Sequence, residues 1–354
     1  QPIRNPGMRS LFVHIGSHKA GSTALQDSLL ANRGSDAGFR YLHHPRLRTH
    51  SVLAAMYKPF ETLDHTIRLQ MPDPEVVALV RRNFWQRIPE HFPDADNAVL
   101  SSEYLSAIDT DAVRRFRDDV EAMGYGRFRI VLYVREAVSR FTSGIQQAVK
   151  FRNDVPRMDP RILYFNFREQ IETWESVFPG EVEVRAFERG QLTGGCVVAD
   201  AYSRISEFFG MKADPAKVVD SNRSMSTETL FCLYNLYRHL DTARFSERQV
   251  RIQNRLYKQI ETLVQNSVSA PSRITLCPAV ARMVYERHRA DYDWLSQHYG
   301  IRFQDPVMLP DSSETGPLRL SDPPTLPEMV MPPDPRMLIQ LLGKIGADGL
   351  FRSR

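Results

Sequence analysis

One segment near the N-terminus limits the possible folds of this chain more than any other, because it joins a buried strand to a helix through a glycine-rich turn. Residues 10–15, Ser-Leu-Phe-Val-His-Ile, form an apolar run that predicts a strand. Gly-Ser-His-Lys-Ala-Gly-Ser-Thr follows at 16–23, and apolar residues at helical spacing continue to Leu30. Glycines let the backbone turn tightly, and the N–H groups and dipole at a helix start attract an anion. The segment therefore predicts a cradle for a phosphate-like group.

The rest of the first half of the chain alternates between strand and helix patterns. Further strand patterns lie at 97–103, 127–135 and 181–187. Helical periodicity separates them, at about 74–90, 110–122, 136–150 and 164–177. This alternation predicts an α/β fold with a parallel β-sheet of the P-loop type, flanked by helices and with ligands at the carboxyl ends of the strands.

The second half of the chain is predicted to be helical, and it ends in a proline-rich tail. Helical patterns lie at 195–209, 225–240, 245–266 and 278–298. Nine of the 23 prolines lie between positions 306 and 335, which indicates an extended segment. We therefore expect one domain at 9–304, a flexible or foreign N-terminal segment at 1–8, and a tail at 305–354. The tail is expected to end in a short docking helix at 337–345.

The composition is that of a globular protein with a mildly basic charge. A net charge of +4 favours an anionic ligand but is too small to indicate nucleic-acid binding. No apolar run reaches the roughly 18–20 residues that would span a membrane, and no signal peptide is recognisable. The three cysteines are widely spaced, so we expect reduced thiols and a cytoplasmic protein. Because the sequence opens with Gln1 rather than Met, the presence of an earlier N-terminal anchor stays open.

The loop differs from that of a nucleoside triphosphatase in the position of its lysine. The triphosphatase pattern places a lysine directly after the second glycine, followed by a hydroxyl that binds Mg²⁺. Here Ser22 takes that place, and Lys19 precedes Gly21 by two residues. The strand patterns end in Ser-Ser-Glu and Val-Arg-Glu, without the aspartate that would hold the metal. A magnesium-dependent kinase or NTPase is therefore the less favoured alternative.

The loop resembles the donor loop of the PAPS-dependent sulfotransferases, especially the bacterial carbohydrate-type members. PAPS is 3′-phosphoadenosine 5′-phosphosulfate. The matching stretch at 12–26 reads Phe-Val-His-Ile-Gly-Ser-His-Lys-Ala-Gly-Ser-Thr-Ala-Leu-Gln, and the family has G-x-x-K-x-G-[ST]-[ST] followed by a Leu-Gln helix. The resemblance implies that Lys19 contacts the oxygen bridging phosphorus and sulfur. It also implies that the 5′-phosphosulfate is held by the backbone of the loop and by the hydroxyl groups of its Ser17, Ser22 and Thr23. The residues of this donor loop are Gly16, Ser17, His18, Lys19, Ala20, Gly21, Ser22 and Thr23.

A second match to the same family lies at the end of the strand pattern 127–135. Arg135 is followed eight residues later by Ser143, and the resemblance implies that this pair binds the 3′-phosphate of PAPS. An arginine offers a planar fork of donors to a dianion, and Ser143, two helical turns further on, is expected to face the same side. The family has Asp-Pro after this arginine, whereas this chain has Glu136 and Ala137. We therefore expect a looser turn there.

Two weaker likenesses concern the rest of the nucleotide. Phe187 ends a strand pattern that resembles the one whose aromatic residue lies near the adenine. The segment 221–226, which includes Asn222, resembles one that is expected to contact the nucleotide, although Ser224 or Ser226 serves equally well there as a plain helix cap. The resemblance covers about 9–300, strongly at the two phosphate segments, and does not include the tail.

Sulfuryl transfer requires a general base for the proton of the acceptor, and two residues are candidates. Glu103 ends the strand pattern 97–103, where relatives carry a catalytic histidine or a Ser-x-Glu. Burial beside a cleft raises the pKa of such a carboxyl group; the other interpretation of Glu103 is a helix cap or an ion pair. His50 is the alternative base, since some relatives place one after the second strand. The basic stretch 40–48 is either a solvated loop or a surface for a glycan.

The resulting expectation is an enzyme that transfers the sulfuryl group of PAPS, without a metal, to a hydroxyl or amine of an acceptor and releases 3′,5′-ADP. The acceptor is expected to be a carbohydrate or glycoconjugate. Lys19 is expected to stabilise the leaving oxygen, because positioning and electrostatics dominate such transfers. The alternatives are the P-loop kinase or NTPase and a catalytically inactive nucleotide-binding protein. The sequence does not specify the acceptor or the oligomeric state.

Overall fold

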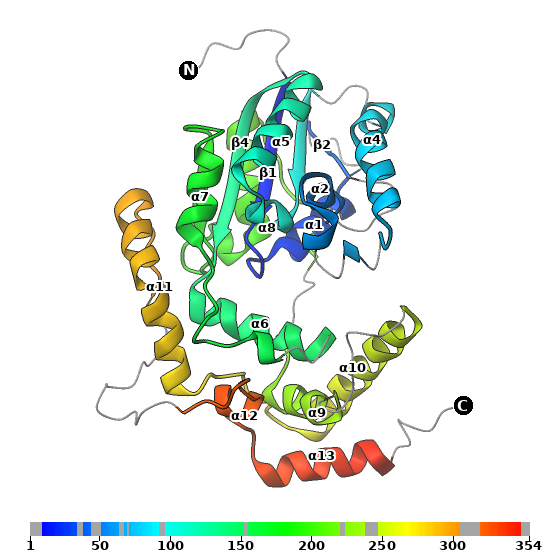
Figure 1. The fold of residues 1–354 in the computed structure, drawn as a ribbon, viewed down its shortest axis with the longest axis vertical. Helices are drawn as coiled ribbons and strands as arrows, with labels where there is room; N and C mark the ends of the chain where they lie inside the picture. Colours follow the sequence, from blue (N-terminus) through cyan, green and yellow to red (C-terminus); the bar gives the residue numbers. More distant parts are fainter. Residues whose placement is uncertain are drawn as a thin grey trace. The chain divides into compact units, whose positions relative to one another are not determined.

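The centre of the fold is a sheet of five strands, all parallel, in the order β2-β3-β1-β4-β5 (Figure 1). The strands are β1 (Arg9–Gly16), β2 (Arg40–Tyr41), β3 (Asn97–Ser101), β4 (Tyr125–Val134) and β5 (Val182–Ala186). Four of them lie at the ranges that the apolar runs predict. The edge strand β2 has two residues, too few for a hydrophobic pattern to be recognised. The prediction of an α/β fold with a parallel sheet is confirmed.

The computed structural model describes residues 9–33, 38–43, 51–63, 67–68, 71–91, 96–151, 155–219, 224–237, 247–304 and 319–347. The chain forms two compact units, and each is assembled from three separate segments. The first contains Gln1–Glu136, Asn166–Asn222 and Asp291–Phe303. The second contains Ala137–Phe165, Arg223–Ala290 and Gln304–Arg354. The single domain expected at 9–304 stays a prediction.

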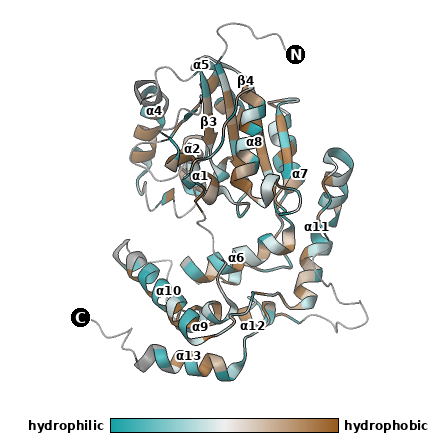
Figure 2. Cartoon of the chain, turned by 180° about the vertical axis from the view of Figure 1, so that it is seen from behind, coloured by the Kyte–Doolittle hydropathy of each residue, from teal (hydrophilic) through white to brown (hydrophobic). Residues whose placement is uncertain are grey.

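Helices cover both faces of the sheet in the first unit. On one face, α1 and α8 share a core with the strand residues Phe12, Val99 and Val131. On the other face, α5 and α7 pack together through Phe116 and Trp174, whose ring centroids lie 5.6 Å apart. Figure 2 shows α8 in front of largely hydrophobic strands. The helices of this unit are α1 (Ser22–Ala31), α2 (Ser51–Tyr57), α4 (Pro74–His91), α5 (Thr110–Ala122), α7 (Phe167–Glu175) and α8 (Val197–Phe209), with the 3-10 turns η1 (Phe60–Thr62), η2 (Glu103–Ala107) and η4 (Thr193–Gly195).

Local sequence signals explain where these elements begin and end. β1 is buried along its length after Arg9, as expected for a parallel strand with helices on both faces. α5 begins where the carboxylate of Asp109 accepts a hydrogen bond of 2.8 Å from the N–H of Ala112. α8 ends at Gly210, whose φ of 66° is left-handed. The caps therefore fix the lengths of the helices that support the sheet.

The second unit is helical. Helices α6, α9 and α10 pack against one another, and α13 packs against α9 and α10. The backbone of Leu276 pairs with that of Val330, which joins the last described segment of the chain to this unit. The helices are α6 (Ala137–Phe151), α9 (Thr227–Tyr237), α10 (Glu247–Ser267), the first part of α11 (Pro278–Tyr299), α12 (Leu326–Met329) and α13 (Pro335–Ala347), with the 3-10 turn η3 (Val155–Arg157).

Two further expectations concern the whole described chain. Within the described ranges, no helix combines the length and the apolar character that crossing a membrane would need. The cysteines Cys196, Cys232 and Cys277 are free thiols, which agrees with the prediction of unpaired cysteines.

Candidate functional site

The glycine-rich loop leaves the carboxyl end of β1 through three residues with positive φ. Gly16 has a φ of 118° and Gly21 a φ of 78°, conformations that glycine adopts without steric cost. Lys19 lies between them with a φ of 68°. A residue with a Cβ loses about 1–2 kcal/mol of conformational free energy when its backbone adopts this left-handed conformation. The loop therefore holds its lysine in a strained backbone conformation, which the surrounding contacts must stabilise.

Ser17 ties the loop to the neighbouring strand β4. It is fully buried, and both its N–H and its hydroxyl donate to the carbonyl oxygen of Tyr133, each at 2.9 Å. Ser22 is also buried, and its hydroxyl donates to the carbonyl oxygen of Ser17 at 3.4 Å. Thr23, by contrast, is exposed at the start of α1. Of the three predicted hydroxyl donors, two thus hold the loop in shape in this structure.

The start of α1 has the features of an anion site. Its cap residue is Gly21, and no side chain caps the helix. The first N–H groups of an α-helix have no partner within the helix, and they carry the positive end of its dipole. α1 is ten residues long, and the loop leads directly into its N-terminus. These groups suit a phosphate or sulfate group.

Arg135, at the end of β4, lies against the same loop. Its Nη1 donates to the carbonyl oxygen of Lys19 at 2.8 Å. Its guanidinium carbon lies 5.6 Å from the ring centroid of Phe187, and a Cβ on Gly21 would come within 2.8 Å of that ring. Burial lowers the pKa of Arg135, and the carboxylate of Glu136 acts in the opposite direction. The loop, Arg135 and Phe187, predicted separately, therefore meet at one edge of the sheet.

Glu103 lies on the other side of the loop, where it begins η2 directly after β3. It is half-buried, and its Oε2 accepts a hydrogen bond of 2.9 Å from the side-chain amide of Gln26 on α1. A Cβ on Gly16 would come within 3.0 Å of the carbonyl oxygen of Glu103, so a glycine is required where the loop passes η2. The edge of the His18 ring packs against Tyr104, with centroids 4.9 Å apart. The candidate base thus adjoins the loop.

His14 lies in β1, two residues before Gly16, and its side chain is part of the buried interior. It is buried, and its Nδ1 lies 2.8 Å from the hydroxyl oxygen of Ser101. Burial lowers its pKa to about 4, partly offset by a hydrogen bond with the backbone of Gly16. A neutral imidazole at this position agrees with the structural role expected for a histidine within a strand.

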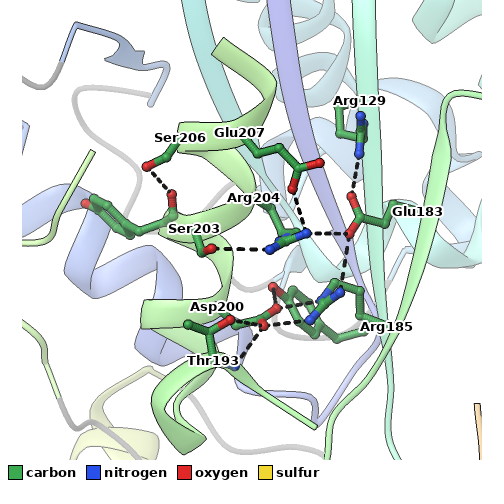
Figure 3. A network of polar contacts seen from close by, with 11 residues as sticks. Arg129, Glu183, Arg185, Thr193, Asp200, Ser203, Arg204, Ser206 and Glu207 are labelled. Carbon is green, nitrogen blue, oxygen red and sulfur yellow. Dashed lines mark hydrogen bonds and ion pairs between the residues drawn. The ribbon is translucent and has the colours of Figure 1, made fainter. Parts of the chain in front are cut away.

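A buried polar network anchors the strands that carry Arg135 and Phe187 (Figure 3). Its centre is Asp200 on α8, which is fully buried. The carboxylate of Asp200 accepts two hydrogen bonds of 2.7 Å from Arg185 on β5 and one of 2.8 Å from the hydroxyl of Tyr133 on β4. The hydroxyl and the N–H of Thr193 donate to it as well. The network therefore fixes β4, β5 and α8 relative to one another.

Three residues of this arrangement were not found by sequence reasoning: Gln26, Tyr133 and Asp200. Gln26 is a single amide on the buried side of α1, and Asp200 is a carboxylate on the buried side of α8. A polar residue on the buried face of a helix needs a hydrogen-bonding partner. That requirement is the sequence signal by which Gln26 and Asp200 could have been recognised. Tyr133 acts mainly through its carbonyl oxygen, for which no sequence signal exists.

The remaining predicted site residues are Ser143, His50 and Asn222. Ser143 is half-buried on α6. It belongs to the second unit, whereas the loop belongs to the first. His50 and Asn222 lie outside the described residues. Within the described ranges, no three His, Cys, Asp or Glu side chains gather as a metal site would require.

Comparison with known proteins adds no further assignment. A scan against models of protein families finds none that matches this chain, and a search of the curated proteins finds no match. The function must therefore be argued from the residues and their geometry.

Proposed function

We propose that this protein is a PAPS-dependent sulfotransferase that acts in the cytoplasm on a hydroxyl or amine of a carbohydrate or glycoconjugate. The observation that carries the proposal is the hydrogen bond from Arg135 to the carbonyl oxygen of Lys19. It joins two segments 116 residues apart in the sequence, each of which resembles a different phosphate-binding segment of one family. If either resemblance were a coincidence of sequence, there would be no reason for the two segments to contact each other in the fold.

The geometry of the loop fits a donor with two separated anionic groups. The uncapped start of α1 suits the 5′-phosphosulfate. Arg135 uses one of its five N–H donors on Lys19, which leaves donors for a 3′-phosphate. Phe187 lies beside this guanidinium and offers an aromatic face for a base. Partial burial strengthens the attraction between Arg135 and an anion, because less water screens it.

The residues of the site then divide the chemistry between them. PAPS supplies a sulfuryl group whose bond to the bridging oxygen breaks as the bond to the acceptor oxygen or nitrogen forms. Lys19 stabilises the negative charge that remains on the bridging oxygen. Glu103 takes the proton of the acceptor, and Gln26 orients its carboxylate through the 2.9 Å hydrogen bond. His50 is the alternative base.

The direct test is to incubate the protein with PAPS and extracts of glycans and metabolites, and to search by mass spectrometry for products that gain one SO₃ unit. We expect Lys19→Ala and Arg135→Ala to abolish the product, and Arg135→Ala also to weaken binding of 3′,5′-ADP. Arg114→Ala is the matched control, because Arg114 is an exposed residue of α5 whose one ion pair among the described residues is with Asp111. Wild-type product formation by both site variants would refute the proposal. Tight binding of 3′,5′-ADP without any sulfated product would favour an inactive nucleotide-binding protein.

A further inference from the structure

A cavity of about 250 Å³ lies in the first unit, where α2, α4 and α5 meet. No residue of the donor loop lines it, and neither Arg135 nor Phe187 does. Its apolar lining comes from Met56 on α2 and Trp85 on α4. Its volume is below the roughly 300–1,000 Å³ of pockets for drug-sized ligands. The cavity therefore suits a ligand about the size of one sugar ring.

Two arginines line this cavity, and both are held at the C-terminal end of α2. The Nε of Arg81 donates to the carbonyl oxygen of Ala55 at 2.9 Å, and its Nη2 donates to that of Lys58. The Nη2 of Arg115 donates to the carbonyl oxygen of Tyr57 at 3.2 Å. These carbonyl groups carry the negative end of the helix dipole, which explains how two like charges are kept close together.

The two guanidinium groups keep most of their hydrogen-bonding capacity. An arginine has five N–H donors, and the contacts within the described chain use two of Arg81 and one of Arg115. Burial lowers the pKa of Arg81, and the charge of Arg115 lowers it further, with Glu61 opposing both. Both side chains are exposed, and the repulsion between their like charges is one that an anion bound between them would offset.

The cavity also has two carboxylates, and neither forms an ion pair with these arginines among the described residues. Asp119 accepts hydrogen bonds from the hydroxyl of Tyr57 at 2.7 Å and from the Nε1 of Trp85 at 3.1 Å. This carboxylate is thus engaged with neutral donors in the cavity wall. Asp118 is exposed at the rim. The positive charges remain available to a ligand, and Asp118 tunes the charge at the entrance.

We propose that this cavity binds a small organic anion, whose carboxylate, sulfate or phosphate group lies between Arg81 and Arg115 and whose carbon skeleton packs against Met56 and Trp85. Arginine pairs bind such groups through charge-assisted hydrogen bonds, often two at a time. This site is independent of the proposed donor site, since none of its residues takes part in binding or transfer there. It can therefore be tested without knowledge of the acceptor.

The test is isothermal titration of the full-length protein with glucose 6-sulfate, glucuronate and inorganic sulfate, with glucose as the neutral control. We expect the sugar anions to bind better than inorganic sulfate, and glucose to bind least. Arg81→Gln and Arg115→Gln should each weaken binding of the best anion by about tenfold or more, as the loss of a charged hydrogen bond does. Arg82→Gln is the control, because Arg82 is exposed, follows Arg81 on α4 and does not line the cavity.

A second variant guards against a loss of folding, since Arg81 and Arg115 also stabilise the end of α2. Asp118→Asn removes a negative charge from the rim, and Asp118 makes no side-chain contact among the described residues that folding would need. Binding of the anion should strengthen by roughly threefold in this variant, because one repulsive charge is removed. Weaker binding of the same anion by Asp118→Asn would show that Asp118 supports binding instead of repelling the ligand, and that the anion does not lie where the two arginines dominate the charge. That result, or failure of every anion to bind at millimolar concentration, would overturn the proposal.

Discussion

The backbone conformation of Lys19 leads to an unusual prediction about stability. Its φ of 68° lies in the left-handed region, which costs a residue with a Cβ about 1–2 kcal/mol. Glycine avoids this cost but loses about 0.5–1 kcal/mol through the greater freedom of its unfolded chain. The difference predicts that Lys19→Gly is more stable than Lys19→Ala by roughly 0.5–1 kcal/mol. Both variants keep the hydrogen bond from Arg135, because it is accepted by the main-chain oxygen.

The assay is urea unfolding of the two variants under identical conditions, compared through their free energies of unfolding. The control pair is Arg114→Gly and Arg114→Ala, on the exposed side of α5, where alanine should be the more stable by about 1 kcal/mol. The order should thus reverse between the two positions. If Lys19→Ala is as stable as Lys19→Gly or more stable, the loop does not hold Lys19 in a strained conformation, and the reasoning is refuted. Both variants of Lys19 lack the ammonium group and should be inactive.

Three further predictions concern the support of the site. Burial lowers the pKa of His14 from its ordinary value of 6.5 to about 4. Between pH 4 and pH 6.5 the folded state therefore binds fewer protons than the unfolded chain. Wild-type stability should therefore fall by about 3 kcal/mol as the pH drops from 6.5 to 4, and His14→Asn should remove this slope in unfolding measured across that range. Gly21→Ala would place its Cβ 2.8 Å from Phe187 and should destabilise the protein by about 2 kcal/mol in urea unfolding; unchanged stability would contradict the packing described. Asp200→Asn weakens the hydrogen bonds from Arg185 and should cost about 2 kcal/mol, with a lower melting temperature as the readout.

The elements of the sheet were predictable from the sequence because each obeys a local rule. β1 and β4 are continuous apolar runs, and the helices between them have apolar residues at helical spacing. The loop was predictable for a related reason, since its glycines mark a tight turn between a strand and a helix. Arg135 was singled out because its segment resembles the one that binds the 3′-phosphate in the PAPS-dependent sulfotransferases, and no local rule would have distinguished it from a surface arginine.

The support of the site was not predictable, because it depends on contacts between segments far apart in the sequence. Ser17 was expected to hold the donor through its hydroxyl, whereas in this structure that hydroxyl donates to the carbonyl oxygen of Tyr133. Gln26 and Glu103 are 77 positions apart, and no local pattern joins them. The strained backbone of Lys19 is likewise invisible in the sequence, since lysine has no preference for left-handed turns.

The central claim is that the loop at Lys19 and the guanidinium of Arg135 together bind a nucleotide with phosphates at both its 3′ and 5′ positions. It is tested most directly by isothermal titration of the wild-type protein with 3′,5′-ADP, 5′-AMP and ATP, each with EDTA and with Mg²⁺. We predict that 3′,5′-ADP binds in EDTA at least about tenfold more tightly than 5′-AMP, because the second phosphate adds charge-assisted hydrogen bonds. Equal affinity for 3′,5′-ADP and 5′-AMP, or tighter binding of ATP that requires Mg²⁺, would contradict the account.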